Sequence, residues 1–195
     1  VDPNVYARMN FGASYRATTR KLDSYGFRLN IEPGKQYDYF ESRDGRFFIY
    51  ENFISTGANL SSNYNRTFAI NLRANIGTLF ETGRDLFTYD FEIEPRVRVN
   101  DHLLLVYELN FDYRNGARGY ATSENDEAIF GERNRQRVTN SLRGSYNFNP
   151  FHSLGLTFRH YWDTVAYDNE LFTLLDNGRL TTDSGYTVDN VSDNP

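Results

Sequence analysis

The feature that most constrains this sequence is an alternation of apolar and polar residues, which occurs twice in succession between Phe87 and Tyr113. In the first stretch, from Phe87 to Val99, apolar side chains occupy every second position and most intervening side chains are charged. The second stretch repeats the pattern from Leu103 to Tyr113. Successive side chains of a β-strand point to opposite faces, so the period of two predicts two long strands that are apolar on one face.

The same alternation elsewhere predicts about eight strands in all. They are expected at residues 5–15, 25–31, irregularly within 47–60, then 68–80, 87–99, 103–114, 138–148 and 154–162. Most of these runs reach the length of about 9–11 residues that a tilted strand needs to cross a bilayer. Strand length therefore favours a membrane protein.

Composition agrees with a sheet that is apolar on one face only. Hydrophobic residues make up 39% of the chain, whereas 16% of the chain is aromatic. No run approaches the roughly 18–20 consecutive apolar residues of a membrane helix, so any crossing must be made by strands. The sequence predicts an all-β protein: an antiparallel up-and-down transmembrane β-barrel, or a fragment of a larger one, in the bacterial outer membrane.

The expected connections alternate between short and long. The short ones are residues 16–20, 61–65, 100–102 and 149–153, and the longer ones are 33–46, 81–86 and 115–133. Outer-membrane barrels have short periplasmic turns and longer external loops. The short connections are therefore expected at the periplasmic end and the longer ones outside. Both termini then lie toward the outside, so we expect residues 1–195 to be one barrel segment that is incomplete at both ends.

Strand register can be predicted at two turns. The apolar positions on both sides of residues 100–102 are odd, which requires a three-residue loop that pairs Val99 with Leu103. The same parity across residues 81–86 places Arg73 opposite Glu94, as an ion pair of at most about 1 kcal/mol. Pro95 cannot donate a ladder hydrogen bond, so a local irregularity is expected there.

The candidate functional residues are charged side chains on the polar faces of these strands, where they would line a lumen. They are Arg73, Asp90, Glu92, Glu94, Glu108, Asp112, Arg137, Arg143 and Arg159. The simplest interpretation is a hydrated wall. Because the acidic members crowd residues 87–114 and most basic ones follow residue 136, an alternative is that opposed walls orient a polar or zwitterionic solute.

The sequence gives little support for catalysis, metal binding or nucleic-acid binding. His102 and His152 fall in short turns and His160 on an apolar face, none with the partners of a catalytic triad, so no enzyme is expected. His160 would be an interfacial histidine, unless a bulge at residues 159–161 turned it inward. The acidic run at 124–127 lacks the spaced ligands of a calcium loop, and no cofactor is expected. The net charge of −5 without a basic stripe argues against nucleic acid.

The last third of the chain resembles a known family. The resemblance is carried by residues 130–133, 138–142, 145–148, 156–162 and 174–180, together with Tyr167. The family is known chiefly from Bacteroidota, and in it a carbohydrate-binding family 9-like module precedes a large C-terminal outer-membrane barrel of unknown function. The resemblance implies outer-membrane lipid around the chain and links it to carbohydrate only through a module that this sequence lacks. It transfers no catalytic residue.

Three functions stay open at this point. The first is a conduit for polar solutes or glycans through a charged lumen. The second is a membrane anchor or docking platform with a plugged lumen, which binds a periplasmic or surface protein. The third is a soluble lipocalin-like barrel, whose apolar side would turn inward and hold an apolar ligand.

Overall fold

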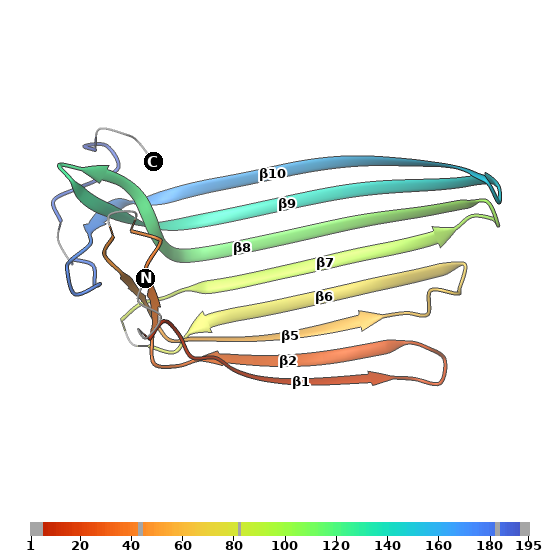
Figure 1. Cartoon of the computed structure of the whole chain (residues 1–195), viewed down its shortest axis with the longest axis horizontal. Coiled ribbons are helices and arrows are strands. Elements are labelled where there is room, and N and C mark those ends of the chain that lie inside the picture. Colours follow the sequence, from red (N-terminus) through yellow and green to blue (C-terminus); the bar gives the residue numbers. More distant parts are fainter. Residues whose placement is uncertain (1–5, 43–44, 82, 182–183, 192–195) are drawn as a thin grey trace.

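A computed structural model describes residues 6–42, 45–81, 83–181 and 184–191, and these residues form ten β-strands (Figure 1). The strands are β1 (Phe11–Thr18), β2 (Ser24–Glu32), β3 (Gln36–Asp38), β4 (Phe48–Tyr50), β5 (Phe53–Ser61), β6 (Phe68–Leu79), β7 (Phe87–Arg98), β8 (Leu103–Glu124), β9 (Glu127–Asn149) and β10 (His152–Thr173). The described part of the chain contains no helix long and apolar enough to span a membrane. The predicted all-β class is confirmed.

Eight of the strands form one antiparallel sheet in the order β1-β2-β5-β6-β7-β8-β9-β10. The other two strands, β3 and β4, form a small hairpin inserted between β2 and β5. The sheet is curved but does not close, because β1 and β10 are its two edges (Figure 1). The expected antiparallel sheet of eight strands is confirmed, whereas its closure into a barrel stays a prediction.

The two ends of the sheet differ in the length of their connections, as Figure 1 shows. The turns β1–β2, β5–β6, β7–β8 and β9–β10 lie together at one end, which we call the turn end; the β2–β5 and β6–β7 connections and the tip of the β8–β9 hairpin lie at the other. In the β7–β8 turn the Val99 amide donates to the Leu103 carbonyl oxygen over 2.9 Å. The predicted three-residue loop is therefore confirmed.

Asp23 joins two of the turns. Its carboxylate accepts hydrogen bonds from the Asn63 amide (3.0 Å) and from the Arg66 guanidinium (2.9 Å), so the β1–β2 turn is tied to the β5–β6 turn. These two hydrogen bonds, that of the Asn63 backbone first, lower the pKa of Asp23 from its ordinary value.

One face of the sheet is apolar from β1 to β10, and we call it the apolar face. Residues directly opposite in an antiparallel pair lie on the same face. The facing pairs include Tyr15 with Phe27, Leu72 with Ile93, Phe91 with Phe111 and Leu142 with Phe158. Many of these side chains are uncovered, and Phe158 has 68% of its surface exposed. The predicted alternation thus produces a continuous, exposed apolar surface.

The expected loop at residues 115–133 is wrong. Strands β8 and β9 continue through it as a long hairpin that ends where Glu124 faces Glu127. The turn residues Asn125 and Asp126 have φ angles of 49° and 65°, as a two-residue type I′ turn requires. Two register shifts in the β8–β9 pairing, one of them between Arg114 and Ala117, interrupt the regular alternation of side chains. The period of two was therefore not visible in the sequence there.

Other strand boundaries also differ from expectation. The irregular strand within 47–60 is two strands, β4 and β5, and the first strand begins at Phe11, while Val5 lies outside the described residues. At Pro95 the pairing with β6 stays in register, and the pairing with β8 is interrupted and resumes at Arg96 without a shift. No register shift occurs at residues 159–161, so His160 stays on the apolar face.

A compact core lies at the end of the sheet away from the short turns, and we call this region the cap. Its first cluster joins Phe48, Ala128, Phe130 and Leu174, with the rings of Phe48 and Phe130 4.7 Å apart. A second cluster joins Ile129, Leu171 and Val191. The cap therefore buries apolar side chains from β4, the β8–β9 hairpin and the segment after β10, as in an ordinary water-soluble domain.

Candidate functional site

All nine candidate residues lie on the face opposite the apolar one, which we call the polar face. Arg73 comes from β6, and the three acidic residues of β7 and two of β8 follow along the sheet. The rows across the sheet place Glu92 opposite Arg73, Asp90 opposite Asp112, and Asp112 opposite Arg137. Another row runs from Glu108 through Ser141 to Arg159. The structure thus brings the predicted residues together on one wall.

The ion pairs on this wall differ from the one predicted. Arg73 lies 3.1 Å from Glu92. The expected partner, Glu94, lies two residues further along β7. Glu94 instead contacts Arg143 at 3.4 Å, and Arg143 also contacts Glu108 at 3.2 Å. The predicted parity was correct, but parity alone cannot distinguish registers that differ by two residues.

Two acidic residues of the wall face each other. Asp90 and Asp112 are direct partners across β7 and β8, where like charges are unfavourable. The Asn75 amide donates to Asp90 over 2.7 Å, and Arg114 lies 3.6 Å from Asp112. These contacts and the water-accessible setting compensate for the repulsion.

Asp163 is a member of the wall that sequence reasoning missed. It lies on β10, where Arg135 and Arg137 both form ion pairs with it, the latter at 3.3 Å, and the Tyr161 hydroxyl donates to it over 2.6 Å. The alternation breaks down past Trp162, because the apolar Val165 lies on the same face as Asp163, so no regular pattern pointed to Asp163. Arg159, by contrast, forms no ion pair with any described residue.

The unpaired positive charge on the polar face is not on β9, where the sequence predicted it. Arg137 and Arg143 are neutralised by carboxylates, so they do not form a free basic wall opposite the acidic strands. Free positive charge lies instead at the other edge, on Arg16 of β1 and Arg28 of β2, for which no ion pair with a described residue exists. Neither had been singled out from the sequence, because their neighbours depend on strand register.

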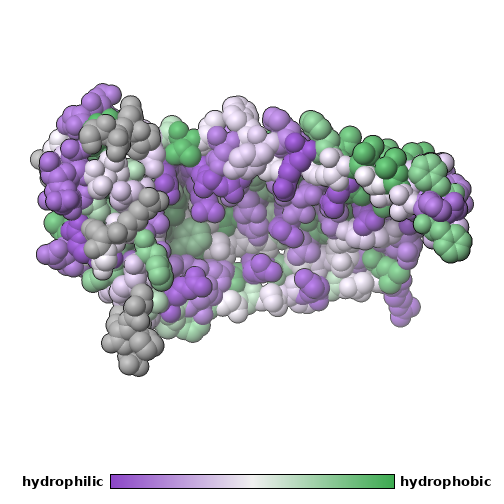
Figure 2. Space-filling model, turned by 45° about the horizontal axis from the view of Figure 1, so that its top comes forward, coloured by the Kyte–Doolittle hydropathy of each residue, from purple (hydrophilic) through white to green (hydrophobic). Residues whose placement is uncertain are grey.

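The polar face is hollowed. A hollow of about 700 Å³ is bordered by Arg28, Asp90, Asp112 and Arg135 from the sheet and by Tyr50 from β4. Smaller hollows of about 380, 350 and 300 Å³ follow the same face. Figure 2 shows hydrophilic side chains gathered along the hollowed middle of the molecule. The charged wall is therefore the concave side of the curved sheet.

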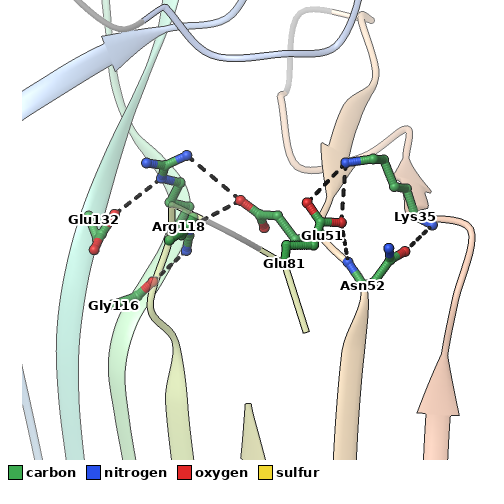
Figure 3. A network of polar contacts seen from close by, with 8 residues as sticks. Lys35, Glu51, Asn52, Glu81, Gly116, Arg118 and Glu132 are labelled. Carbon is green, nitrogen blue, oxygen red and sulfur yellow. Dashed lines mark hydrogen bonds and ion pairs between the residues drawn. The ribbon is translucent and has the colours of Figure 1, made fainter. Parts of the chain in front are cut away.

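A polar network lies at the cap end of this concave side, and Figure 3 shows it at close range. Arg84, from the β6–β7 connection, has Nε 3.0 Å from Glu51 Oε1 without hydrogen-bond geometry, while its terminal nitrogens donate to Glu51 and to the Gly116 carbonyl oxygen. Arg118 bridges Glu51 at 3.7 Å and Glu132 at 3.2 Å. Burial, opposed in part by Glu51, lowers the pKa of Arg84.

The network extends to the β2–β3 connection. The Lys35 ammonium lies 3.2 Å from Glu81, and the same carboxylate accepts a hydrogen bond of 3.0 Å from the Asn52 amide. The Asn52 hydrogen bond first, and Lys35 after it, lower the pKa of Glu81. These contacts fix the links β2–β3, β4–β5 and β6–β7 to one another. No sequence pattern predicts these contacts, because Lys35, Asn52 and Glu81 all lie in connections.

The remaining candidate groups stay apart. The His102 Nδ1 atom lies 2.6 Å from the Asn147 carbonyl oxygen, and that of His152 lies 3.1 Å from Asn149, whereas His160 faces Asn140 on the apolar face. The acidic run at 124–127 forms the hairpin tip. Within the described ranges, no three His, Cys, Asp or Glu side chains are grouped to hold a metal ion.

Fold and site together define an all-β protein built on one antiparallel sheet with an exposed apolar face and a charged, concave face. The chain belongs to the family described as Domain of unknown function (DUF5916), whose sequence profile matches residues 1–194. No curated protein and no solved structure matches the chain. The resemblance seen in the sequence is confirmed as membership of a family of unknown function.

Proposed function

We propose that this chain is a segment of a bacterial outer-membrane β-barrel whose polar face lines a water-filled lumen that conducts polar solutes. The observation that carries the proposal is the exposed apolar face. Leu156 and Phe158 each have 68% of their surface exposed and Trp162 has 56%, on a sheet whose opposite face is charged. An apolar surface of this extent requires a cover, and lipid is the cover that suits a face spanning eight strands.

The direction of curvature supports lipid outside rather than ligand inside. A lipocalin-like barrel would place its apolar side chains on the concave side, around the ligand. Here the hollow of about 350 Å³ is bordered mostly by arginine, asparagine and glutamate side chains, and the hollow of about 700 Å³ by charged residues together with Tyr50, Phe53 and Leu86. The soluble barrel is thus the weaker of the alternatives.

Unpaired edges also favour a larger assembly of strands. The edges β1 and β10 leave backbone donors and acceptors unpaired, and such groups are not tolerated in hydrocarbon. In the proposed barrel, further strands of the same protein pair with both edges. The cap and its polar network then lie outside the bilayer, on the side opposite the short turns.

The plugged anchor or docking platform is a second candidate, and one observation favours it. Residues 48–52 lie at the end of the concave side, where Tyr50 borders the hollow of about 700 Å³ and Glu51 is held by Arg84 and Arg118. In the proposed barrel, a segment held in this way would narrow the lumen at the cap. In that case a periplasmic or surface protein would bind the cap, and the lumen would carry no current.

Conductance separates the two candidates. The full-length protein is reconstituted into planar bilayers, and current is recorded in a potassium chloride gradient for wild type and for Arg143→Gln. The conduit predicts measurable current, with a shift of the reversal potential toward cation selectivity in the variant, because Glu94 and Glu108 lose their partner. A silent protein that is correctly inserted would contradict the conduit and support the anchor.

A further inference from the structure

A groove on the polar face crosses β1, β2, β5 and β6, and we call it the arginine groove. Two adjoining hollows of about 380 and 350 Å³ form it. Both are bordered by Arg16, Arg28, Asn59, Arg73 and Asn75. The groove thus gathers three guanidinium groups and two amides on four neighbouring strands.

Strand register explains why these side chains converge. In one row across the sheet, Arg16 faces Gly26, Gly26 faces Asn59, and Asn59 faces Arg73. In the next row, Arg28 faces Gly57, which in turn faces Asn75. The rows are adjacent, so Arg16 and Arg28 each lie beside a glycine, and these two arginines occupy diagonal positions within reach of one ligand.

The two glycines leave room for the asparagine side chains of the groove. A Cβ atom added to Gly26 would lie 2.6 Å from Asn59 Oδ1, and one added to Gly57 would lie 1.9 Å from Asn75 Oδ1. The asparagine side chains therefore lie flat over the glycines. This leaves the space above them open between the arginines.

Only some of the polar side chains of the groove form hydrogen bonds or ion pairs with other described residues. Arg73 pairs with Glu92 at 3.1 Å, and Asn75 donates to Asp90 over 2.7 Å. The guanidinium groups of Arg16 and Arg28 and the amide of Asn59 have no partner among the residues that the structure describes. This contrasts with β9, where Arg135, Arg137 and Arg143 are all bound to carboxylates.

We propose that the arginine groove binds an oxyanion group, a carboxylate or a phosphate, carried on a hydroxyl-rich solute. A guanidinium group binds such an oxyanion through two parallel hydrogen bonds. The free amide of Asn59 supplies a donor and an acceptor for a neighbouring hydroxyl. This inference rests on the proposed function in that the groove then lines the lumen and makes the conduit selective for acidic solutes.

The test is isothermal titration calorimetry of the full-length protein in an uncharged detergent, with sodium glucuronate and with glucose as its neutral match. The variant is the double substitution Arg16→Gln and Arg28→Gln, which removes no hydrogen bond or ion pair between described residues. The control is Arg98→Gln, which removes one charge from the polar face about 20 Å away along β7. Inorganic phosphate is added as a competitor.

Glucuronate is expected to bind wild type and Arg98→Gln alike, and at least about tenfold more weakly to the double variant, because each charge-assisted pair contributes about a factor of ten. Glucose is expected to bind at least about tenfold more weakly than glucuronate, and phosphate to displace glucuronate. Equal binding of the two sugars, equal loss in Arg98→Gln, or failure of phosphate to compete would each overturn the proposal.

Binding and conduction can fail separately. Titration in detergent does not require current, so a silent protein that still binds glucuronate contradicts the conduit and leaves the oxyanion site in place. A conducting protein that does not distinguish glucuronate from glucose contradicts the site and leaves the conduit in place.

Discussion

Phe130 and Phe158 lie on neighbouring strands, yet the protein surrounds them in opposite ways. Phe130 in the cap is fully buried against Phe48, whereas Phe158 on the apolar face of the sheet has 68% of its surface exposed. Phenylalanine is thus buried in one region of the chain and exposed in the other. The cap contains a packed apolar core, whereas the apolar face of the sheet is not covered by other parts of the described chain.

The contrast teaches where each region obtains its stability. In the cap, apolar burial and close packing stabilise the fold in water. On the sheet, the apolar side chains gain little from protein contacts and stabilise the fold only when an apolar medium covers them. In water alone this face would promote aggregation. Substitutions in the cap, on the sheet and at the turn end should therefore differ in their effects, with the largest in the cap.

The largest effect is expected in the cap. Phe130→Ala removes a fully buried ring and leaves a cavity, which should lower the free energy of unfolding by about 3–5 kcal/mol. Denaturant unfolding of the full-length protein in detergent, followed by tryptophan fluorescence, measures it. A loss below about 1 kcal/mol would show that the cap is not a packed core.

The next prediction compares the same substitution on the apolar and the polar face, at two neighbouring residues of β10. Leu156 lies on the apolar face, and its neighbour Gly155 lies on the polar face with no atom within 4 Å of an added Cβ. In lipid vesicles Leu156→Arg should lower the free energy of unfolding by about 1–3 kcal/mol, less than at the bilayer midplane because the turn is near. Gly155→Arg, the matched control, should cost much less. Equal costs would remove the distinction between the faces.

The smallest effect concerns the turn end. The pKa of Asp23 is lower in the folded protein than its ordinary value of 3.8, so its stabilising contribution is complete above that value and is lost as the pH falls through the folded pKa. Asp23→Asn should therefore flatten the decrease of Tm with acid below about pH 4. Thermal unfolding between pH 6 and pH 2 gives the slope of Tm against pH for wild type and for Asp23→Asn. Equal slopes for the two proteins would contradict a role for Asp23.

The sheet was predictable from sequence because a single regular period governs it. Alternation predicted the faces of the strands within residues 68–114 and 138–148, and parity predicted the loop that pairs Val99 with Leu103. It also put every candidate charge on one wall. Register beyond parity was not predictable, which is why Arg73 pairs with Glu92 rather than Glu94.

The cap and the arginine groove were hidden for different reasons. In the β8–β9 hairpin, register shifts and mixed side chains removed the period, so strand continued where a loop was expected. The groove depends on which residues face Gly26 and Gly57 across strands, and no local pattern encodes those partners. Long-range pairing decides both features.

The most direct test of the account is lipid accessibility along β7, since the chain has no cysteine of its own. Single cysteines are introduced at residues 92–97 of the full-length protein, labelled with a fluorophore and exposed to quenchers within the bilayer of vesicles. The account predicts that labels at Ile93 and Val97 are quenched and that those at Glu92 and Glu94 are spared. A uniform lack of quenching would contradict a membrane-spanning sheet, and the apolar face would then need a protein cover.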